Sequence, residues 1–204
     1  MGSHPIHDEQ SVFLNVPFDK GYEHLFVALI ASIVSLGRKP RCVLEIAEQG
    51  QGRLPRIIEH LEGCRVSIHD LSRVGQPARF NMPFELGLAY ALRRYKSSPS
   101  PYFFILLEKV RNRLSRTLSD VAGHDPGIHR GRPLGIISCV LDALSTGEND
   151  PTSQQVYALW RKLMKAARNL KLSEGRDTIF SRTLFKRLVA AASELGVRAQ
   201  LIHK

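Results

Sequence analysis

A glutamate in the segment 81–87, Asn-Met-Pro-Phe-Glu-Leu-Gly, is the residue best placed for chemistry. Asn81 can cap a helix and Pro83 fits its first turn, so Glu85 falls about one turn inside a helix that is apolar on nearly every side. A buried carboxylate there can stabilise a developing cation or form a covalent bond at a sugar carbon, as in glycosyl transfer. The alternative is structural, because an acid near a helix N-terminus complements the macrodipole by about 0.3–1 kcal/mol.

Polar residues also follow the β-prone segment 64–69. Asp70 and Ser72 come directly after this segment, at the expected carboxyl end of a strand. Ligands of parallel α/β sheets bind outside the carboxyl ends of the strands, so we expect these two side chains to share a cleft with Glu85. The same rule selects Asn15, which lies near the end of the first β-prone segment.

Three arginines fall in loops that are expected to follow strands: Arg53, Arg73 and Arg79. Guanidinium groups bind phosphate oxygens in pairs, so these side chains could hold a pyrophosphate, which would favour a dinucleotide over a free nucleoside. The alternative is that they are solvated side chains of a basic protein. The residues alone leave both interpretations open.

Histidines next to acids suggest general acid–base chemistry. His69 adjoins Asp70, and His124 and His129 flank an Asp-Pro-Gly turn. Strand alternation turns His69 and Asp70 to opposite faces of a sheet, and a histidine in a turn is more often a hydrogen-bonding residue than a catalyst. Ser72 lies in no G-x-S-x-G elbow, so a Ser-His-Asp hydrolase has no support.

Several motif classes do not occur in the sequence. No G-x-G-x-x-G follows the first strand segment and there is no G-x-x-x-x-G-K-[S/T], which leaves hydride transfer and P-loop ATP chemistry without support. The spacings C-x-x-C and H-x-x-x-H, typical of zinc sites, are also missing. We therefore expect neither a metal nor a bound cofactor.

The elements that position these residues alternate between strand and helix patterns. Continuous apolar strands are predicted at 11–16, 41–46, 64–69 and 102–107, and amphipathic or buried helices at 22–37, 54–61 and 82–95. Strands separated by helices form parallel sheets with helices on both faces. The sequence thus predicts a three-layer α/β fold with a four- or five-stranded parallel sheet.

The rest of the chain is predicted to be mainly helical. A turn-rich loop at 120–129 precedes a helix at 133–144, and a linker-like string at 145–150 precedes helices at 152–170 and 182–195. Residues 197–202 are predicted to be an edge strand or an extended tail. We expect an α/β domain at 11–145 and a helical C-terminal extension at 151–204.

Composition excludes fibrous, disordered and membrane-spanning classes. The 204 residues are 43% hydrophobic and 24% charged, and no apolar run approaches the roughly 18–20 residues that span a bilayer. Three widely spaced cysteines among apolar residues indicate reduced thiols, so we expect a cytoplasmic protein without membrane contact. Residues 1–10 lack the order of a signal peptide and are expected to be a disordered N-terminus.

Charge is unevenly distributed along the chain. It has 29 Lys and Arg against 19 Asp and Glu, a net charge of +10. Residues 1–150 contain 18 basic and 16 acidic residues, whereas residues 151–204 contain 11 and 3. The predicted helix at 152–170 carries four of the cations on one side: Arg161, Lys162, Lys165 and Arg168. This basic extension is either a face that binds nucleic acid or a protein partner, or a solvated helix surface.

Three of these features together resemble the TIR-like and nucleoside 2-deoxyribosyltransferase-like families. They are the segment 13–19, Phe-Leu-Asn-Val-Pro-Phe-Asp, the acid and serine that end the third strand, and the segment 81–87. The resemblance covers residues 11 to about 108. It implies a flavodoxin-like sheet and an enzyme that cleaves the N-glycosidic bond of NAD or a nucleoside with a glutamate at the position of Glu85.

The resemblance also implies roles for the neighbouring residues. Glu85 would be the nucleophile or cation stabiliser, and Asp70 and Ser72 would hold ribose hydroxyls or orient Glu85. The remaining substrate-binding residues would be Phe13 and Asn15 in the base or ribose pocket and Asn81 at the sugar. The sequence departs from the families before the glutamate, where Arg-Phe-Asn-Met-Pro replaces their Gly-rich or small residues. The leaving base and the acceptor therefore stay undetermined.

The resemblance thus implies a TIR-like N-glycosidase for which NAD or a related nucleotide is the substrate and not a cofactor. Bacterial proteins of this kind act in antiphage defence and assemble, so a homo-oligomer is expected. The alternative is a non-catalytic nucleotide-sensing or protein-interaction module, with nucleic acid as a further partner through residues 151–204.

Overall fold

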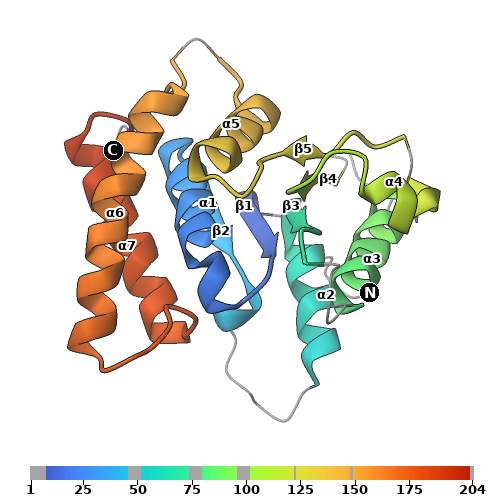
Figure 1. Cartoon of the computed structure of the whole chain (residues 1–204), viewed down its shortest axis with the longest axis horizontal. Coiled ribbons are helices and arrows are strands. Elements are labelled where there is room, and N and C mark those ends of the chain that lie inside the picture. Colours follow the sequence, from blue (N-terminus) through green and yellow to red (C-terminus); the bar gives the residue numbers. More distant parts are fainter. Residues whose placement is uncertain are drawn as a thin grey trace, which may run out of the picture.

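A five-stranded parallel sheet lies at the centre of the molecule (Figure 1). The computed structural model describes residues 8–45, 52–73, 80–95, 102–121, 123–147 and 149–202. The strands are β1 Asp8–Asn15, β2 Lys39–Arg41, β3 Cys64–Asp70, β4 Phe103–Glu108 and β5 Gly127–Ile128. Their order is β2-β1-β3-β4-β5, with parallel pairing throughout, which confirms the predicted flavodoxin-like sheet.

Helices cover both faces of this sheet. The helices are α1 Glu23–Ser35, α2 Arg53–Gly63, α3 Asn81–Tyr95, α4 Leu114–Thr117, α5 Pro133–Leu144, α6 Ser153–Ser173 and α7 Arg182–Arg198. Val12 and Leu14 of β1 belong to one core with α1 and α5, whereas Phe13 belongs to a second core with α2 and α3. The alternation of side chains along β1 therefore divides the interior into two apolar layers.

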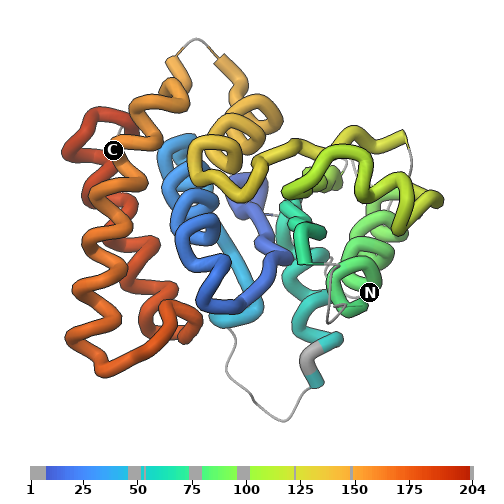
Figure 2. The backbone as a smooth tube through the Cα atoms, in the orientation of Figure 1, coloured from blue at the N-terminus to red at the C-terminus, as the bar shows by residue number. Residues whose placement is uncertain are grey.

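The C-terminal helices α6 and α7 pack on the outer side of α1 (Figure 2). Twelve of the thirteen residues of α1 are buried, because the helix packs against the sheet, against α5 beside it, and against α6 and α7 on its outer side. Leu163 of α6 and Leu188 of α7 are fully buried in the same core as β1. The segment from residue 151 is helical as expected, and it completes the core of the α/β unit.

Polar contacts reinforce this packing at the start of α1. Glu23 accepts hydrogen bonds from Lys171 Nζ at 2.7 Å and from the backbone N–H of Ile179 at 3.0 Å. Trp160 Nε1 donates to the carbonyl oxygen of His24 at 3.0 Å. These contacts join α1 to α6 and to the loop before α7, and they fix where the two C-terminal helices lie.

Two strand boundaries differ from the sequence prediction. β1 begins at Asp8, so residues 8–10, expected to be disordered, belong to the sheet. The strand predicted at 41–46 is instead Lys39–Arg41, followed by a 3₁₀ turn. Glu45 Oε2 accepts hydrogen bonds from Arg41 Nε at 2.8 Å and from the N–H of Cys42 at 3.1 Å, which turns the chain away from the sheet.

The sequence prediction also missed one strand and placed another wrongly. β5, Gly127–Ile128, lies inside the loop predicted at 120–129. Residues 197–202, predicted to be an edge strand or extended tail, are the end of α7 and a turn in which the N–H of Leu201 donates to the carbonyl of Gly196 at 3.0 Å. Ile202 folds back onto Gly196 so closely that a Cβ there would collide with it.

No helix in the described part of the chain combines the length and apolar character needed to cross a membrane.

We expect Leu163→Ala to lower the free energy of unfolding by about 2–5 kcal/mol, because it leaves a cavity in the core that α6 shares with α1 and the sheet. Leu172→Ala is the matched control in the same helix, since Leu172 is 80% exposed, and should change stability by about 0.5 kcal/mol or less. Urea unfolding followed by circular dichroism measures both. A Leu163→Ala protein whose sheet unfolds at the wild-type urea concentration would contradict a shared core.

Candidate active site at the carboxyl ends of the strands

The strand register brings polar residues to one edge of the sheet. Asn15 of β1 lies beside His69 of β3, and Asp70 lies beside Leu107 of β4. Glu108 at the end of β4 lies beside Ile128 of β5, and His129 follows directly. The carboxyl ends of four strands therefore meet at the edge where parallel α/β sheets bind ligands.

Glu85 belongs to the buried side of α3. The buried residues of this helix are Met82, Glu85, Leu86 and Ala89, a stripe with helical spacing. Its three apolar members pack in the core layer that contains Phe13, so Glu85, which is 4% exposed, faces the sheet from the same side. Burying a carboxylate costs free energy, and the other three buried residues of this stripe are apolar.

Asn81 is exposed and is the first residue of α3, so it does not occupy the flanking cap position that the sequence predicted. Phe80 precedes the helix, and its carbonyl accepts the N–H of Phe84 at 3.2 Å. The Asn81 amide donates to the sulfur of Met82 at 3.7 Å. The helix starts one residue earlier than a capping Asn81 would allow, and Glu85 remains about one turn inside it.

A buried network of neutral polar groups lies on the α3 side of the sheet. Asn15 Nδ2 donates to His69 Nδ1 at 2.9 Å, so the ring proton is on His69 Nε2, which lies 2.7 Å from the Ser67 hydroxyl. The Ser67 hydroxyl also hydrogen-bonds to the Tyr102 hydroxyl. Burial lowers the pKa of His69 to about 3, so this imidazole stays neutral and does not serve as an acid near neutral pH.

Asp70 points to the opposite side of the sheet, as strand alternation predicts. Its Oδ2 accepts from the Tyr22 hydroxyl and lies 3.3 Å from His129 Nε2, and its Oδ1 accepts the N–H of Ser72 at 2.8 Å. Burial alone would raise the pKa of Asp70, but the hydrogen bonds from His129, Ser72 and Tyr22 outweigh it and lower the pKa. Asp70 is therefore an ionised carboxylate whose contacts connect the loops that carry Tyr22, Ser72 and His129.

Tyr22 donates a hydrogen bond to Asp70 and itself stays protonated. Burial, together with the negative charge of Asp70, raises the pKa of Tyr22 well above its usual value. The phenol therefore remains a donor to Asp70 throughout the physiological pH range.

The geometry around His129 excludes a serine-hydrolase relay. His129 Nδ1 accepts the N–H of Gly131 at 3.0 Å, which places the ring proton on Nε2 and not on Nδ1. Both Asp70 Oδ2, at 3.3 Å, and Ser72 Oγ, at 2.8 Å, approach this same nitrogen. A relay needs the carboxylate and the serine on different ring nitrogens. Here the Ser72 hydroxyl meets a donor and cannot pass its proton to the ring.

The arginines expected to bind phosphate are only partly described. Arg73 Nη2 donates to Asp19 Oδ1 at 2.7 Å, and the Arg73 side chain is 46% exposed. It is thus held at the end of β1 and still reaches solvent. Arg79 and the side chain of Arg53 lie outside the described residues, so a joint pyrophosphate site remains a prediction.

An ion pair that the sequence did not reveal joins the ends of β3 and β4. Glu108 is 1% exposed, and its carboxylate accepts from Arg113 Nε at 3.1 Å and from Arg113 Nη2. Arg113 Nη2 also donates to the carbonyl of Leu71 at 3.1 Å. The pair is five residues apart in sequence, but its contact with Leu71 depends on strand order, which a local pattern does not show.

The structure therefore divides the predicted site between the two sides of the sheet edge. Phe13 and Asn15 lie on the side of Glu85, whereas both oxygens of Asp70 are engaged on the side of α1. Ser72 lies beside Asp70 and is only partly buried. Asp70 fits a positioning role, because it holds the loop that carries Ser72 and Arg73.

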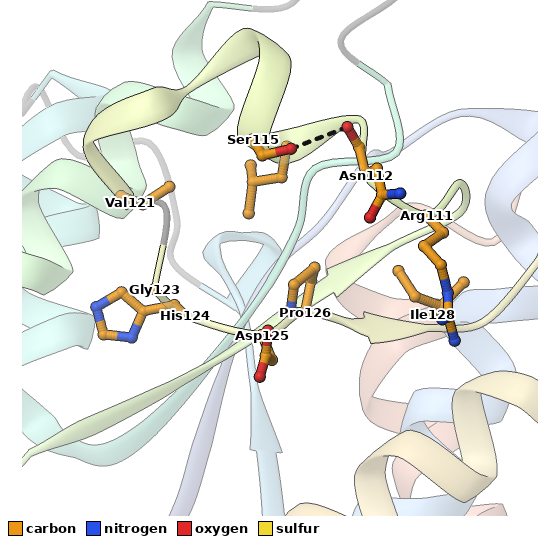
Figure 3. Close-up of a pocket in the computed structure, with 10 residues that line it drawn as sticks. Arg111, Asn112, Ser115, Val121, Gly123, His124, Asp125, Pro126 and Ile128 are labelled. Atoms are coloured by element: carbon orange, nitrogen blue, oxygen red, sulfur yellow. Dashed lines mark hydrogen bonds between the residues drawn. The ribbon is translucent and has the colours of Figure 1, made fainter.

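Three neighbouring cavities surround His124, a residue of the loop before β5. One of about 370 Å³ is lined by this loop and the turn after β4, including Arg111, Asn112 and Asp125 (Figure 3). One of about 580 Å³ lies along β4 and α5, and one of about 290 Å³ lies between α3 and His124. None of the three is lined by Glu85 or Asp70. The sequence predicted only a turn-rich loop at 120–129 and did not predict these cavities.

No family model, curated protein or solved structure matches this chain. In the described residues, no group of three or more His, Cys, Asp or Glu side chains is arranged to hold a metal ion.

We expect Asp70→Asn to destabilise the protein by about 1.5–3 kcal/mol at pH 6, because it removes charge-assisted hydrogen bonds. The folded-state pKa of Asp70 is lowered from 3.8, so this stabilisation is complete above that value and is lost as the pH falls through the folded-state pKa. Urea unfolding at pH 6, 4 and 3 should therefore show the gap to wild type shrinking below pH 4. Asp120→Asn, an exposed carboxylate, controls for the loss of one charge. A gap that stays constant with pH would contradict an ionised Asp70.

Proposed function

We propose that this protein is an N-glycosidase that hydrolyses NAD or a related nucleotide, with Glu85 as the catalytic carboxylate. The observation that carries the proposal is the place of Glu85: an acid 4% exposed in the buried stripe of α3, about one turn inside the helix that follows the carboxyl end of β3 in a flavodoxin-like fold. The resemblance to TIR-like and nucleoside 2-deoxyribosyltransferase-like proteins supports the same residue.

Cleavage of the N-glycosidic bond of NAD mainly requires one negative charge placed close to the ribose. In NAD the bond between the ribose C1′ and the nicotinamide nitrogen breaks, and its electron pair leaves with the ring as neutral nicotinamide. The positive charge passes to C1′ and the ring oxygen of the ribose, where Glu85 stabilises it or bonds to it. Water then adds at C1′ and loses a proton.

The surroundings of the nearby histidines suit a leaving group that needs no proton from the protein. Burial lowers the pKa of His69, so its ring is neutral, and His129 Nε2 already contacts Asp70 and Ser72. Neither is placed as a general acid. A pyridinium ring needs no protonation to leave, whereas an uncharged purine or pyrimidine would. This favours NAD over a simple nucleoside as the substrate.

We assign the substrate-binding residues from the resemblance and, for the described residues, also from their surroundings. Ser72 and Arg73 reach solvent on the loop held by Asp70, where a ribose hydroxyl and a phosphate would bind, and Arg79 and Arg53 would extend the phosphate contacts. The remaining side chains near the sugar and base would be Asn81 at the start of α3 and Phe13 and Asn15 of β1, which are buried on the same side of the sheet as α3. The resemblance extends the proposal to a cytoplasmic homo-oligomer that depletes nucleotide in antiphage defence.

We expect Glu85→Gln to lower the rate of nicotinamide release from NAD by about 10²–10³-fold, because an amide does not stabilise the sugar cation. Chromatographic detection of nicotinamide measures it, over a range of protein concentrations so that assembly is allowed. Glu194→Gln, an exposed residue of α7, is the matched control and should keep the wild-type rate. Thermal unfolding shows whether each variant is folded.

Two results would overturn the proposal. One is equal nicotinamide release by folded Glu85→Gln and wild type. The other is tight NAD binding by wild type, measured by calorimetry, without release at any protein concentration. The second result would identify the alternative, a nucleotide-sensing module that binds without turnover.

A further inference from the structure

The outward side of α6 carries positive charge only. The 21 residues of this helix include five Lys and Arg and no Asp or Glu. Its buried residues, which include Leu159 and Leu163, pack toward α1. Four cations lie on the opposite side and are all exposed: Arg161, Lys162, Lys165 and Arg168, which together we call the α6 basic face.

No described residue neutralises these charges. Among the described residues, the ion pairs of the C-terminal helices are Lys171 with Glu23 and Arg187 with Glu174, and both use cations outside the α6 basic face. None of its four cations forms a hydrogen bond or ion pair with a described residue. The fold therefore leaves four adjacent cations available to a ligand.

We propose that the α6 basic face binds the phosphate backbone of a nucleic acid. At a rise of about 1.5 Å per residue, residues 161–168 span about 10 Å of helix axis. Duplex DNA presents a negative charge about every 1.7 Å along its axis, so several phosphates face a helix segment of this length.

The composition of this side of α6 favours a nucleic acid over a membrane. A helix that lies in a membrane interface buries an apolar face next to its cations. The apolar face of α6 is already covered by α1, α5 and α7. Leu172, 80% exposed, is the large exposed apolar residue of the helix and lies beyond the four cations. The remaining contact is electrostatic, which suits a phosphate backbone and is not sequence-specific.

The α6 basic face lies apart from the site of the proposed glycosidase. The helix α1 separates α6 from the sheet, while Glu85 lies on the other side of the sheet, on α3 (Figure 1). Loss of catalysis and loss of nucleic-acid binding can therefore be scored separately.

The test is fluorescence anisotropy of the full chain with a labelled 30-base-pair duplex at 50–300 mM salt. Four phosphate contacts predict that log K falls with log salt concentration with a slope of about −3.6. Replacing all four cations of the α6 basic face by Gln should remove most of this slope. The paired variants Arg161→Gln with Lys165→Gln, and Lys162→Gln with Arg168→Gln, should each remove about half of it.

A second four-fold variant separates position from total charge. Lys109, Arg116, Arg130 and Arg132 are exposed loop and helix residues away from α6, and changing them to Gln lowers the net charge equally. This control should keep the wild-type slope. The proposal fails if both four-fold variants lose affinity alike, if the α6 variants bind as wild type does, or if wild type binds phosphatidylserine vesicles but no DNA. Wild type without measurable DNA binding at 50 mM salt would overturn it as well.

Discussion

Helix α1 is almost completely buried, and much of the rest of the structure depends on how it is covered. Its apolar residues face both inward to the sheet and outward, so a single layer of helices cannot complete the fold. The hairpin of α6 and α7 supplies the missing cover, and Glu23 and Trp160 fix its position. The C-terminal segment is thus required by the composition of a helix more than a hundred residues earlier in the chain.

A second constraint acts at the carboxyl edge of the sheet, where buried polar groups must find partners. His69 is satisfied by Asn15 and Ser67 on one side, and Asp70 by Tyr22, Ser72 and His129 on the other. These interactions bring together loops from β1, β3 and β5 that share no local sequence pattern. Because these polar groups are already paired with one another, they hold the loops at this edge of the sheet in place.

The sequence predicts the order of elements well, because buried strands and amphipathic helices leave clear periodicities. It fails where an element is too short to have one: β5 has two residues, one of them glycine, and β2 has three around Pro40. The pattern of alternation correctly separated His69 from Asp70. It could not show that Asp70 meets Tyr22 and His129, since those contacts depend on strand order and on loops far away in sequence.

Folding explains only one side of α6. Packing against α1 fixes its apolar residues, but the outward side needs only to be polar, and glutamate or glutamine would serve folding as well as lysine or arginine. A mixture of acids and bases would also be more favourable for the helix, because pairs of opposite charge at i and i+4 stabilise it. Here that side has four cations and no acid. The mutual repulsion of these cations is a small cost to stability that the fold does not require, and an anionic partner accounts for it.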